Sequence, residues 1–270
     1  KKMKNIVFIP YIKREDNQTG QSSIGHSNRH QGYEYGINSW KNWCKKHGHE
    51  LYIMSDLLCP ESEMLITWQR WHVLDILEHN DIDYDQVLVV DADSIVHPDC
   101  PDFFKMTNHK FTSVLTDGDY EWVNRAINGY SKLLFNKEFC IPTFEFFMTG
   151  FVIVNKKHKQ FFNKVFKFYE ENKETIIQSY DTLLTGSDIA IMNCLRAEFN
   201  VDMKLLPREF GLMDMARKNL FYLNPNCWWK DDLTNLYNSG WVYQFNAIPQ
   251  NELGRDRSYW MKRIYEELYN

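Results

Sequence analysis

The sequence has 270 residues, of which 44% are hydrophobic and 16% aromatic. This composition supports a sizeable buried core and excludes a disordered tail or a fibrous repeat. The 31 lysines and arginines against 36 aspartates and glutamates give a net charge of −5, a sign opposite to that of proteins that coat nucleic acid or anionic membranes, so we expect neither partner.

Strand-like runs alternate with helical patterns from the start of the chain, which is typical of parallel strands joined by crossover helices. Residues 5–9 predict the first strand. A polar loop follows at about residues 13–28, and its length is more typical of a functional flap than of a plain connection. A helix then begins at Tyr33 and ends at Gly48, and residues 50–54 predict the second strand.

A further helix is predicted over residues 63–79, and Arg70 lies on its apolar stripe, four residues after Ile66 and three before Val73. A guanidinium on an inward face is rarely left unpaired. Arg70 therefore either forms a structural salt bridge or reaches a cleft to bind a carboxylate or phosphate, and the sequence leaves both open.

Residues 84–93 carry the strongest functional pattern, because four consecutive aliphatic residues precede Asp91-Ala92-Asp93. The aliphatic run predicts a central strand buried on both faces, and ligands of such sheets bind beyond the carboxyl ends of the strands. Paired carboxylates there favour Mg²⁺ or Mn²⁺, which would neutralise charge on a departing nucleoside diphosphate. The alternative is that Asp91 and Asp93 only form salt bridges with Arg70 and nearby lysines.

The same alternation continues to the end of the chain. Strands are predicted at residues 111–116, 147–154, 201–206 and 241–246, and helices near residues 162–169, 188–197 and 261–268. We expect Thr149-Gly150 to interrupt the second of these strands and Ser187 to cap the second helix. Because no linker appears, we predict one α/β domain over residues 1–270, with a donor-binding half at about 1–115 and an acceptor and catalytic half at about 116–270.

The Asp-x-Asp stretch and its surroundings, residues 84–96, resemble the corresponding strand of GT-A-fold glycosyltransferases, especially the retaining glycogenin-like and α-galactosyltransferase-like families. Weaker similarities follow in the family's order: residues 67–77 resemble the preceding helix, 101–104 the following segment, 147–155 the Phe-Asn-Ala/Ser-Gly strand, 188–193 the Asp-Gln-Asp helix start, and 244–247 the late His-Phe-x-Gly. The resemblance implies a Rossmann-like GT-A fold, with a mostly parallel central sheet flanked by helices.

The resemblance also implies an activity, the transfer of a hexose or pentose from a nucleoside-diphosphate donor, with a UDP-sugar favoured, to a hydroxyl of a glycan or glycoconjugate. On this basis Asp91, Ala92 and Asp93 bind the donor diphosphate together with Mn²⁺ or Mg²⁺, and Arg70 contributes to the same site. Gln244 stands where the family has a metal-binding histidine, and its amide oxygen still suits a hard cation. Arg255 or Arg257 would supply a cation to the diphosphate.

The nucleotide base and the acceptor sugar have their own candidates. The same resemblance implies that Pro10 and Tyr11, at the end of the first strand, lie against the uracil or other base, with core packing as the alternative. The adjacent tryptophans Trp228 and Trp229 are weaker candidates for an acceptor platform, because both cannot face inward in regular structure.

Asp188, at a predicted helix start, is the first candidate for a catalytic carboxylate, and Glu145 is the second. Asp188 would either stabilise oxocarbenium character in a retaining reaction or act as the general base of an inverting one. The family's Asn is Met148 here, and its Gln and second Asp are Ile189 and Ala190. Retention is slightly favoured, while an inverting transferase of a neighbouring family and a catalytically silent sugar-nucleotide or glycan-binding module stay open.

The cysteines and the hydropathy bear on the compartment. Six scattered cysteines without zinc-ligand spacing predict free thiols, since a disulfide set needs an oxidising compartment. No apolar run reaches the ~20 residues that cross a bilayer. The chain therefore fits the cytoplasm or, if an N-terminal anchor precedes it, the lumen of the secretory pathway.

Overall fold

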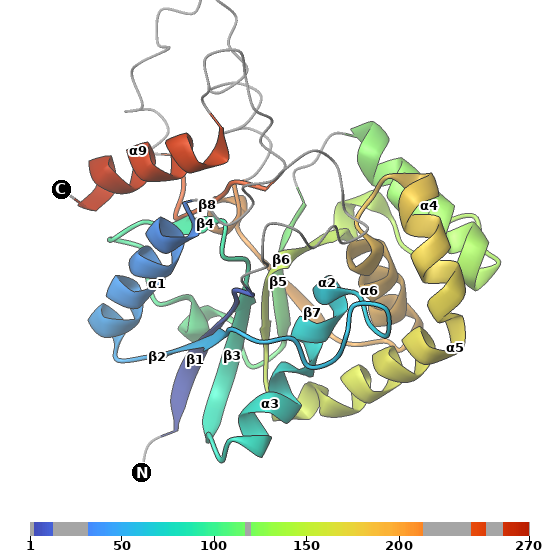
Figure 1. Ribbon diagram of the computed structural model, residues 1–270, viewed down its shortest axis with the longest axis horizontal. Coiled ribbons are helices and arrows are strands. Elements are labelled where there is room, and N and C mark those ends of the chain that lie inside the picture. The colour runs from blue at the N-terminus through green and yellow to red at the C-terminus, as the bar shows by residue number, and fades with distance from the viewer. Residues whose placement is uncertain (1–2, 13–31, 117–119, 213–238, 247–255, 270) are drawn as a thin grey trace, which may run out of the picture.

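A central sheet organises the computed structural model, which describes residues 3–12, 32–116, 120–212, 239–246 and 256–269. Its strands are β1 (Lys4–Pro10), β2 (Glu50–Met54), β3 (Tyr84–Val90), β5 (Phe111–Leu115), β6 (Phe147–Val154) and β7 (Met203–Leu206). They lie in the order β2-β1-β3-β6-β5-β7 (Figure 1). Only β6 runs antiparallel to its neighbours among these six strands. The predicted mostly parallel sheet is confirmed.

Helices cover both faces of this sheet (Figure 1). They are α1 (Tyr33–His47), α2 (Ile66–Gln69), α3 (Val73–His79), α4 (Tyr120–Phe135), α5 (Lys159–Leu183), α6 (Ser187–Glu198) and α9 (Arg257–Tyr269). Short 3-10 turns are η1 (Arg70–His72), η2 (Phe103–Met106), η3 (Thr143–Glu145), η4 (Lys156–His158) and η5 (Arg208–Phe210). Side chains of β1 alternate between the two faces, since Ile6 and Phe8 join the core under α2–α6, whereas Val7 and Ile9 join the core under α1.

A second, two-stranded sheet lies beyond the carboxyl end of β3, toward the C-terminal helix. It pairs β4 (Ser94–Val96) antiparallel with β8 (Val242–Gln244), so that Ser94 lies opposite Gln244. Ile95 and Tyr243 from this ribbon pack with Trp260 and Met261 of α9 in a small core of their own. The ribbon brings residues from the end of the chain to the aspartates that follow β3.

Three local expectations differ from the structure. The helix predicted at 63–79 is divided by the 3-10 turn at Arg70, and Trp68 through Trp71 are all buried because this segment is enclosed between the sheet and the helices beside it. Gly150 does not interrupt β6, whose residues are buried throughout. Ser187 does not cap α6; Gly186 holds the cap position, and the Ser187 hydroxyl accepts a hydrogen bond from Trp68 Nε1 at 3.0 Å.

Within the described residues, none of the helices combines the length and apolar character that crossing a membrane requires. The polar loop predicted at residues 13–28 lies outside these residues.

Candidate active site

Arg70 joins three elements at the carboxyl end of β3. From η1, its guanidinium pairs with Asp91, directly after β3, and with Asp188, in the first turn of α6. Arg70 Nη2 lies 2.6 Å from Asp188 Oδ2, to which Trp71 Nε1 also donates at 3.3 Å. The side chains of Arg70 and Asp188 are only 8% and 5% exposed. Arg70 therefore forms a buried bridge between two of the predicted site carboxylates.

The bare α-carbon of Gly150 lies against two oxygens of the predicted metal site. A β-carbon here would lie 2.7 Å from Asp91 Oδ2 and 3.5 Å from Gln244 Oε1. The Gly150 carbonyl accepts the Asp91 backbone N–H at 3.2 Å and the Gln244 side-chain amide at 3.3 Å. Because Nε2 of Gln244 is the donor, Oε1 is the atom left to act as a ligand. Glycine thus allows a carboxylate and an amide oxygen to share one small space.

Asp93 is held from the opposite direction, by the C-terminal helix. Arg257 Nη1, at the start of α9, lies 3.3 Å from Asp93 Oδ2, and its guanidinium carbon lies 4.7 Å from the centre of the Tyr33 ring. The Asp93 carbonyl accepts the backbone N–H of Phe245 at 2.8 Å, which places Asp93 beside Gln244. The side chain of Asp93 is 10% exposed.

The donor atoms here suit a hard divalent cation. Each aspartate gives one oxygen to its arginine, so the contacts within the described residues leave Asp91 Oδ2 and Asp93 Oδ1 without a donor. Together with Gln244 Oε1 they supply oxygen ligands, which Mg²⁺ and Mn²⁺ prefer. Among the described residues no three His, Cys, Asp or Glu side chains lie close enough to hold a metal. A metal here would therefore depend on the amide of Gln244.

The charge balance also favours a cation. Three carboxylates, those of Asp91, Asp93 and Asp188, lie with two guanidiniums, those of Arg70 and Arg257. Partial burial raises the pKa of Asp91 to about 6, because Arg70 offsets it only in part and the other two carboxylates add repulsion. The surplus of negative charge would be relieved by a bound cation.

The second candidate carboxylate lies elsewhere on the same helix. Glu145, in η3, pairs with Arg196 of α6 at 2.7 Å. Arg196 follows Asp188 by more than two helical turns, roughly 12 Å along the axis. No described contact joins Glu145 to the Arg70 bridge, so the structure places the two candidate carboxylates at opposite ends of α6.

Some of the remaining predicted site residues lie within the described residues and others do not. Pro10 ends β1, and the Tyr11 backbone N–H donates to Met54 at 2.9 Å while its ring lies 5.8 Å from that of Tyr33. Ala92 is buried between the two aspartates. Trp228, Trp229 and Arg255 lie outside the described residues.

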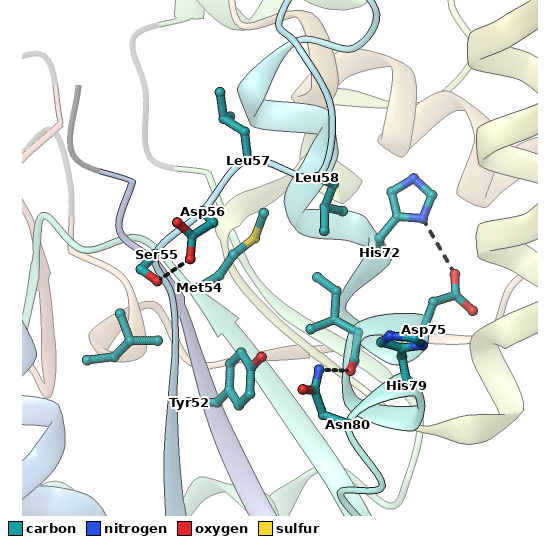
Figure 2. A pocket seen from close by; sticks show the side chains of 12 residues that line it. Tyr52, Met54, Ser55, Asp56, Leu57, Leu58, His72, Asp75, His79 and Asn80 are labelled. Atoms are coloured by element: carbon teal, nitrogen blue, oxygen red, sulfur yellow. Dashed lines mark hydrogen bonds and ion pairs between the residues drawn. The ribbon is translucent and has the colours of Figure 1, made fainter. Parts of the chain in front are cut away.

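A pocket of about 520 Å³ opens at a different place, between the end of β2 and α3 (Figure 2). Tyr52, Leu57 and Leu58 line one side, and His72 and Asp75 line the other. None of the residues predicted for the donor site lines this pocket.

The sequence analysis missed two residues that shape the site, Gly36 beside residues 91–94 (the aspartate turn) and Trp71 beside Asp188. A β-carbon on Gly36 of α1 would collide with the carbonyl oxygens of Ala92 and Ser94. Trp71 donates to Asp188 and was not singled out. An isolated glycine inside a helical pattern was the available signal for Gly36, because it often marks a close backbone approach; no local pattern indicates the role of Trp71.

One solved glycosyltransferase structure shares this architecture, although no family model and no curated protein sequence matches the chain. A glycosyltransferase involved in the glycosylation of the major capsid of PBCV-1 superposes with a TM-score of 0.56 at 11% identity, over 96% of this chain and 99% of that one. The TM-score is 0.49 for the glycosyltransferase GlyE of Streptococcus pneumoniae TIGR4, at 13% identity over 98% of this chain and 63% of GlyE. The TM-score is 0.45 for the galactosyltransferase LgtC, at 12% identity over 98% of this chain and 96% of LgtC.

The likeness to the PBCV-1 enzyme spans nearly the whole of both chains. At 11% identity it defines the fold, which is that of the GT-A glycosyltransferases. The fold expected from the sequence is therefore confirmed.

Proposed function

We propose that this protein is a metal-dependent glycosyltransferase that moves a sugar from a nucleoside-diphosphate donor, a UDP-sugar by preference, to a hydroxyl of a glycan or glycoconjugate. The observation that carries the proposal is the meeting of Asp91 and Gln244 at Gly150, with Asp93 held next to Gln244 by the Phe245 backbone. The bridge from Arg70 to Asp188 lies beside them. This cluster lies beyond the carboxyl end of β3, where open parallel sheets bind their ligands. The glycosyltransferase fold supports the same activity.

Each residue of the cluster has a separate task in this proposal. Asp91, Asp93 and Gln244 would hold Mn²⁺ or Mg²⁺, which supplies electrostatic stabilisation to the departing diphosphate. Arg70 fixes the positions of Asp91 and Asp188 relative to each other through its two ion pairs. Asp188 stays hydrogen-bonded by Arg70 and Trp71 through a single oxygen, Oδ2. Its other oxygen is the one we assign to the sugar.

The proposal includes the division of labour along the chain. Residues of about 1–115 would bind the donor, with Pro10 and Tyr11 against the base, and residues of about 116–270 would bind the acceptor and supply catalytic groups. Asp188 and Gln244 come from the second part and meet Asp91 from the first.

The position of Asp188 allows either stereochemical course, and retention is the one we favour. Lying beneath the anomeric carbon, Asp188 would stabilise oxocarbenium character while the acceptor attacks from the face that the leaving group vacates. Lying beside the acceptor hydroxyl, it would remove the proton in an inverting displacement. Proton NMR of the first-formed product distinguishes the two through its anomeric configuration.

Asp93→Asn tests the metal and donor site. We expect it to weaken Mn²⁺-dependent binding of UDP at least tenfold, or ~1.4 kcal/mol, because a neutral amide replaces one of the charged ligands. Isothermal titration of UDP with and without Mn²⁺ measures this, with the exposed Asp99→Asn as the matched control. UDP affinity that is unchanged in Asp93→Asn, or that needs no metal, would contradict the proposal.

Asp188→Asn and Glu145→Gln compare the two candidate carboxylates. We expect Asp188→Asn to lower kcat about a hundredfold or more, the range typical of a lost acid or base, and Glu145→Gln to have a much smaller effect. Rates of transfer with saturating donor and acceptor decide between them. A larger loss from Glu145→Gln would move the catalytic role to the other end of α6.

A silent sugar-nucleotide or glycan-binding module is the second candidate, and the ion pairs favour it specifically. Both aspartates are already paired with arginines, Asp91 with Arg70 and Asp93 with Arg257. A panel of nucleotide sugars, supplied with Mn²⁺ and acceptor glycans, separates the candidates. Turnover supports the transferase, whereas binding without turnover across the panel supports the silent module.

A further inference from the structure

Two cysteines meet between α6 and the segment that leads into β6. We call residues 136–146 the connector, since they join α4 to β6. Cys140 of the connector is half-buried, and Cys194 of α6 is 1% exposed. Both cysteines contact the Ser131 hydroxyl of α4, and each thiol affects the ionisation of the other.

A shared hydroxyl fixes this thiol pair from the side of α4. Ser131 Oγ accepts the backbone N–H of Cys140 at 2.9 Å and lies 3.8 Å from Cys194 Sγ. Ser131 is itself completely buried, so it holds both cysteines at one defined place. The pairing is therefore a built feature of the packing rather than a chance approach of two surface groups.

The other described cysteines differ from this pair. Cys44 contacts a backbone carbonyl, that of Glu50, and Cys100 contacts that of Pro101. Burial raises the pKa of Cys44 to about 12 and also raises that of Cys100 and Cys59. These thiols have little tendency to ionise, and within the described residues none of them has a second thiol as a partner.

We propose that Cys140 and Cys194 form a redox-sensitive pair, which a low-molecular-weight disulfide such as oxidised glutathione converts into an intrachain disulfide that fastens the connector to α6. The proposal is independent of the sugar-transfer activity. It assigns a covalent modification to two residues that the proposed active site does not use.

Cys140 is the thiol suited to the first step. The neighbouring Cys194 thiol, together with Ser131 and Lys137, lowers the pKa of Cys140 to about 7 despite its partial burial. A thiolate attacks a disulfide far faster than a thiol does. Cys140 is also the more accessible of the two, whereas the neighbouring Cys140 thiol and burial raise the pKa of Cys194.

The chemistry balances as thiol–disulfide exchange. The Cys140 thiolate attacks one sulfur of oxidised glutathione, forms a mixed disulfide and releases one glutathione thiolate. Cys194 then loses its proton to solvent and attacks the Cys140 sulfur, which forms the Cys140–Cys194 bond and releases the second glutathione. Two protein thiols are oxidised, and one glutathione disulfide is reduced to two thiols.

The new bond would reinforce contacts that already tie the connector to α6. Lys137 pairs with Glu198 and Glu145 with Arg196, on either side of the thiol pair along the connector. Asn193, the residue before Cys194, exchanges hydrogen bonds of 2.8 and 2.9 Å with Phe147 at the start of β6. A disulfide at this place closes a long loop of chain. It should stabilise the folded state because it lowers the conformational entropy of the unfolded chain.

The test equilibrates the full-length protein in buffers of graded ratios of reduced to oxidised glutathione, quenches it with an alkylating reagent, and identifies the peptides by mass spectrometry. We expect a Cys140–Cys194 cross-linked peptide to accumulate as the oxidised fraction rises, and the midpoint of thermal unfolding to rise by several degrees. Cys140→Ser should abolish both effects. Cys194→Ser should instead accumulate a stable glutathione adduct on Cys140, because no second thiol resolves it.

Cys59→Ser is the matched control, since Cys59 is also half-buried but has no thiol partner among the described residues. It should leave the cross-link and the unfolding midpoint unchanged. Thiols that remain reduced at every glutathione ratio would overturn the proposal, as would oxidation that begins at Cys59. A cross-link that leaves the unfolding midpoint where it was would overturn the fastening of the connector to α6.

Discussion

The two arginines beside the aspartate pair come from regions that are built in different ways. Arg70 emerges from the main core, is 8% exposed, and bridges Asp91 and Asp188 on two separate elements. Arg257 begins α9, which packs in a small core outside the main sheet, and pairs with Asp93 at 3.3 Å with 18% exposure. The first arginine is fixed by the sheet and α6, whereas the second depends on how α9 lies against the β4–β8 ribbon.

Because of this difference, one arginine should stabilise the fold while the other should leave its aspartate able to bind a ligand. A charge buried between two carboxylates must stay paired, since leaving either carboxylate alone in the interior is costly. Among the described residues, Arg257 instead holds a single carboxylate, through one contact of 3.3 Å from a helix of the small core, so this pair is the easier one to exchange for another partner. We therefore expect Asp93 to be the aspartate that changes its partner when a donor binds, and Asp91 to be the one that stays in place.

Replacing each arginine by methionine is the strongest way to break the comparison. Arg70→Met should destabilise the protein by about 3–5 kcal/mol, because it leaves the buried Asp188 and the partly buried Asp91 without their counter-charge. Arg257→Met should cost less than Arg70→Met, because it leaves one carboxylate, that of Asp93, without its counter-charge. Urea denaturation measures both, and equal losses would show that the two regions are not built differently after all.

The stability of the protein should also depend on pH, and this dependence decides at which pH the two arginine variants can be compared. Burial lowers the pKa of His158, at the end of η4, to about 4 from an ordinary 6.5. Its Nδ1 accepts the backbone N–H of Asn155 at 3.0 Å, so the folded protein holds the neutral ring. Above pH 6.5 both states are neutral and the folded state keeps its full stability. As the pH falls from 6.5 to 4 the unfolded chain takes up the proton first.

The folded state should therefore lose on the order of 3 kcal/mol between these pH values, at 1.36 kcal/mol for each unit of pKa difference. Denaturation midpoints over this range check the slope, and His158→Gln should remove most of it. If the slope survives in His158→Gln, the acid sensitivity belongs to another group, and the Arg70 and Arg257 variants must be compared at neutral pH only.

Gly150→Ala tests whether Asp91 must stay in place for the donor to bind, because Gly150 lies against Asp91 Oδ2 and Gln244 Oε1. The added β-carbon, 2.7 Å from Asp91 Oδ2, must displace that carboxylate, and we expect UDP binding in Mn²⁺ to weaken about tenfold, or ~1.4 kcal/mol. Gly129→Ala is the matched control, because its β-carbon would also lie 2.7 Å from a neighbour, but from a methyl group of Leu183 on α5. Equal losses of UDP binding in both variants would mean that Gly150 acts only through general packing.

The sequence indicated the fold and the central aspartates because those signals are local. An aliphatic run without alternation predicts a buried strand wherever it occurs, and β3 ends where Asp91 begins. Arg70 was placed on an inward stripe, and the structure shows its salt bridges to Asp91 and Asp188, whereas its role in binding a ligand stays a prediction.

Other features depend on contacts between distant segments. Nothing near Gly150 in the sequence shows that Gln244 lies beside it, because the β4–β8 pairing creates that contact. The 3-10 turn at Arg70 arises from enclosure by neighbouring elements and not from a helix breaker in the sequence. The helix α4 was missed although Val123, Ala126, Ile127 and Tyr130 carry a helical apolar spacing that the structure buries.

The first turns of α1 have a consequence for the whole aspartate turn. Gly36 touches the carbonyls of Ala92 and Ser94 with no side chain between them, and Gly32 approaches the backbone of Ser258 on α9 in the same way. Trp40, one turn further along, donates to the Ser94 hydroxyl at 2.9 Å. The N-terminal end of α1 thus packs between residues 92–94 and α9, and it influences the distance between Arg257 and Asp93. A side chain added at Gly36 would displace the carbonyls of Ala92 and Ser94, and one added at Gly32 would displace α9 at Ser258. Either change would alter the distance between Arg257 and Asp93.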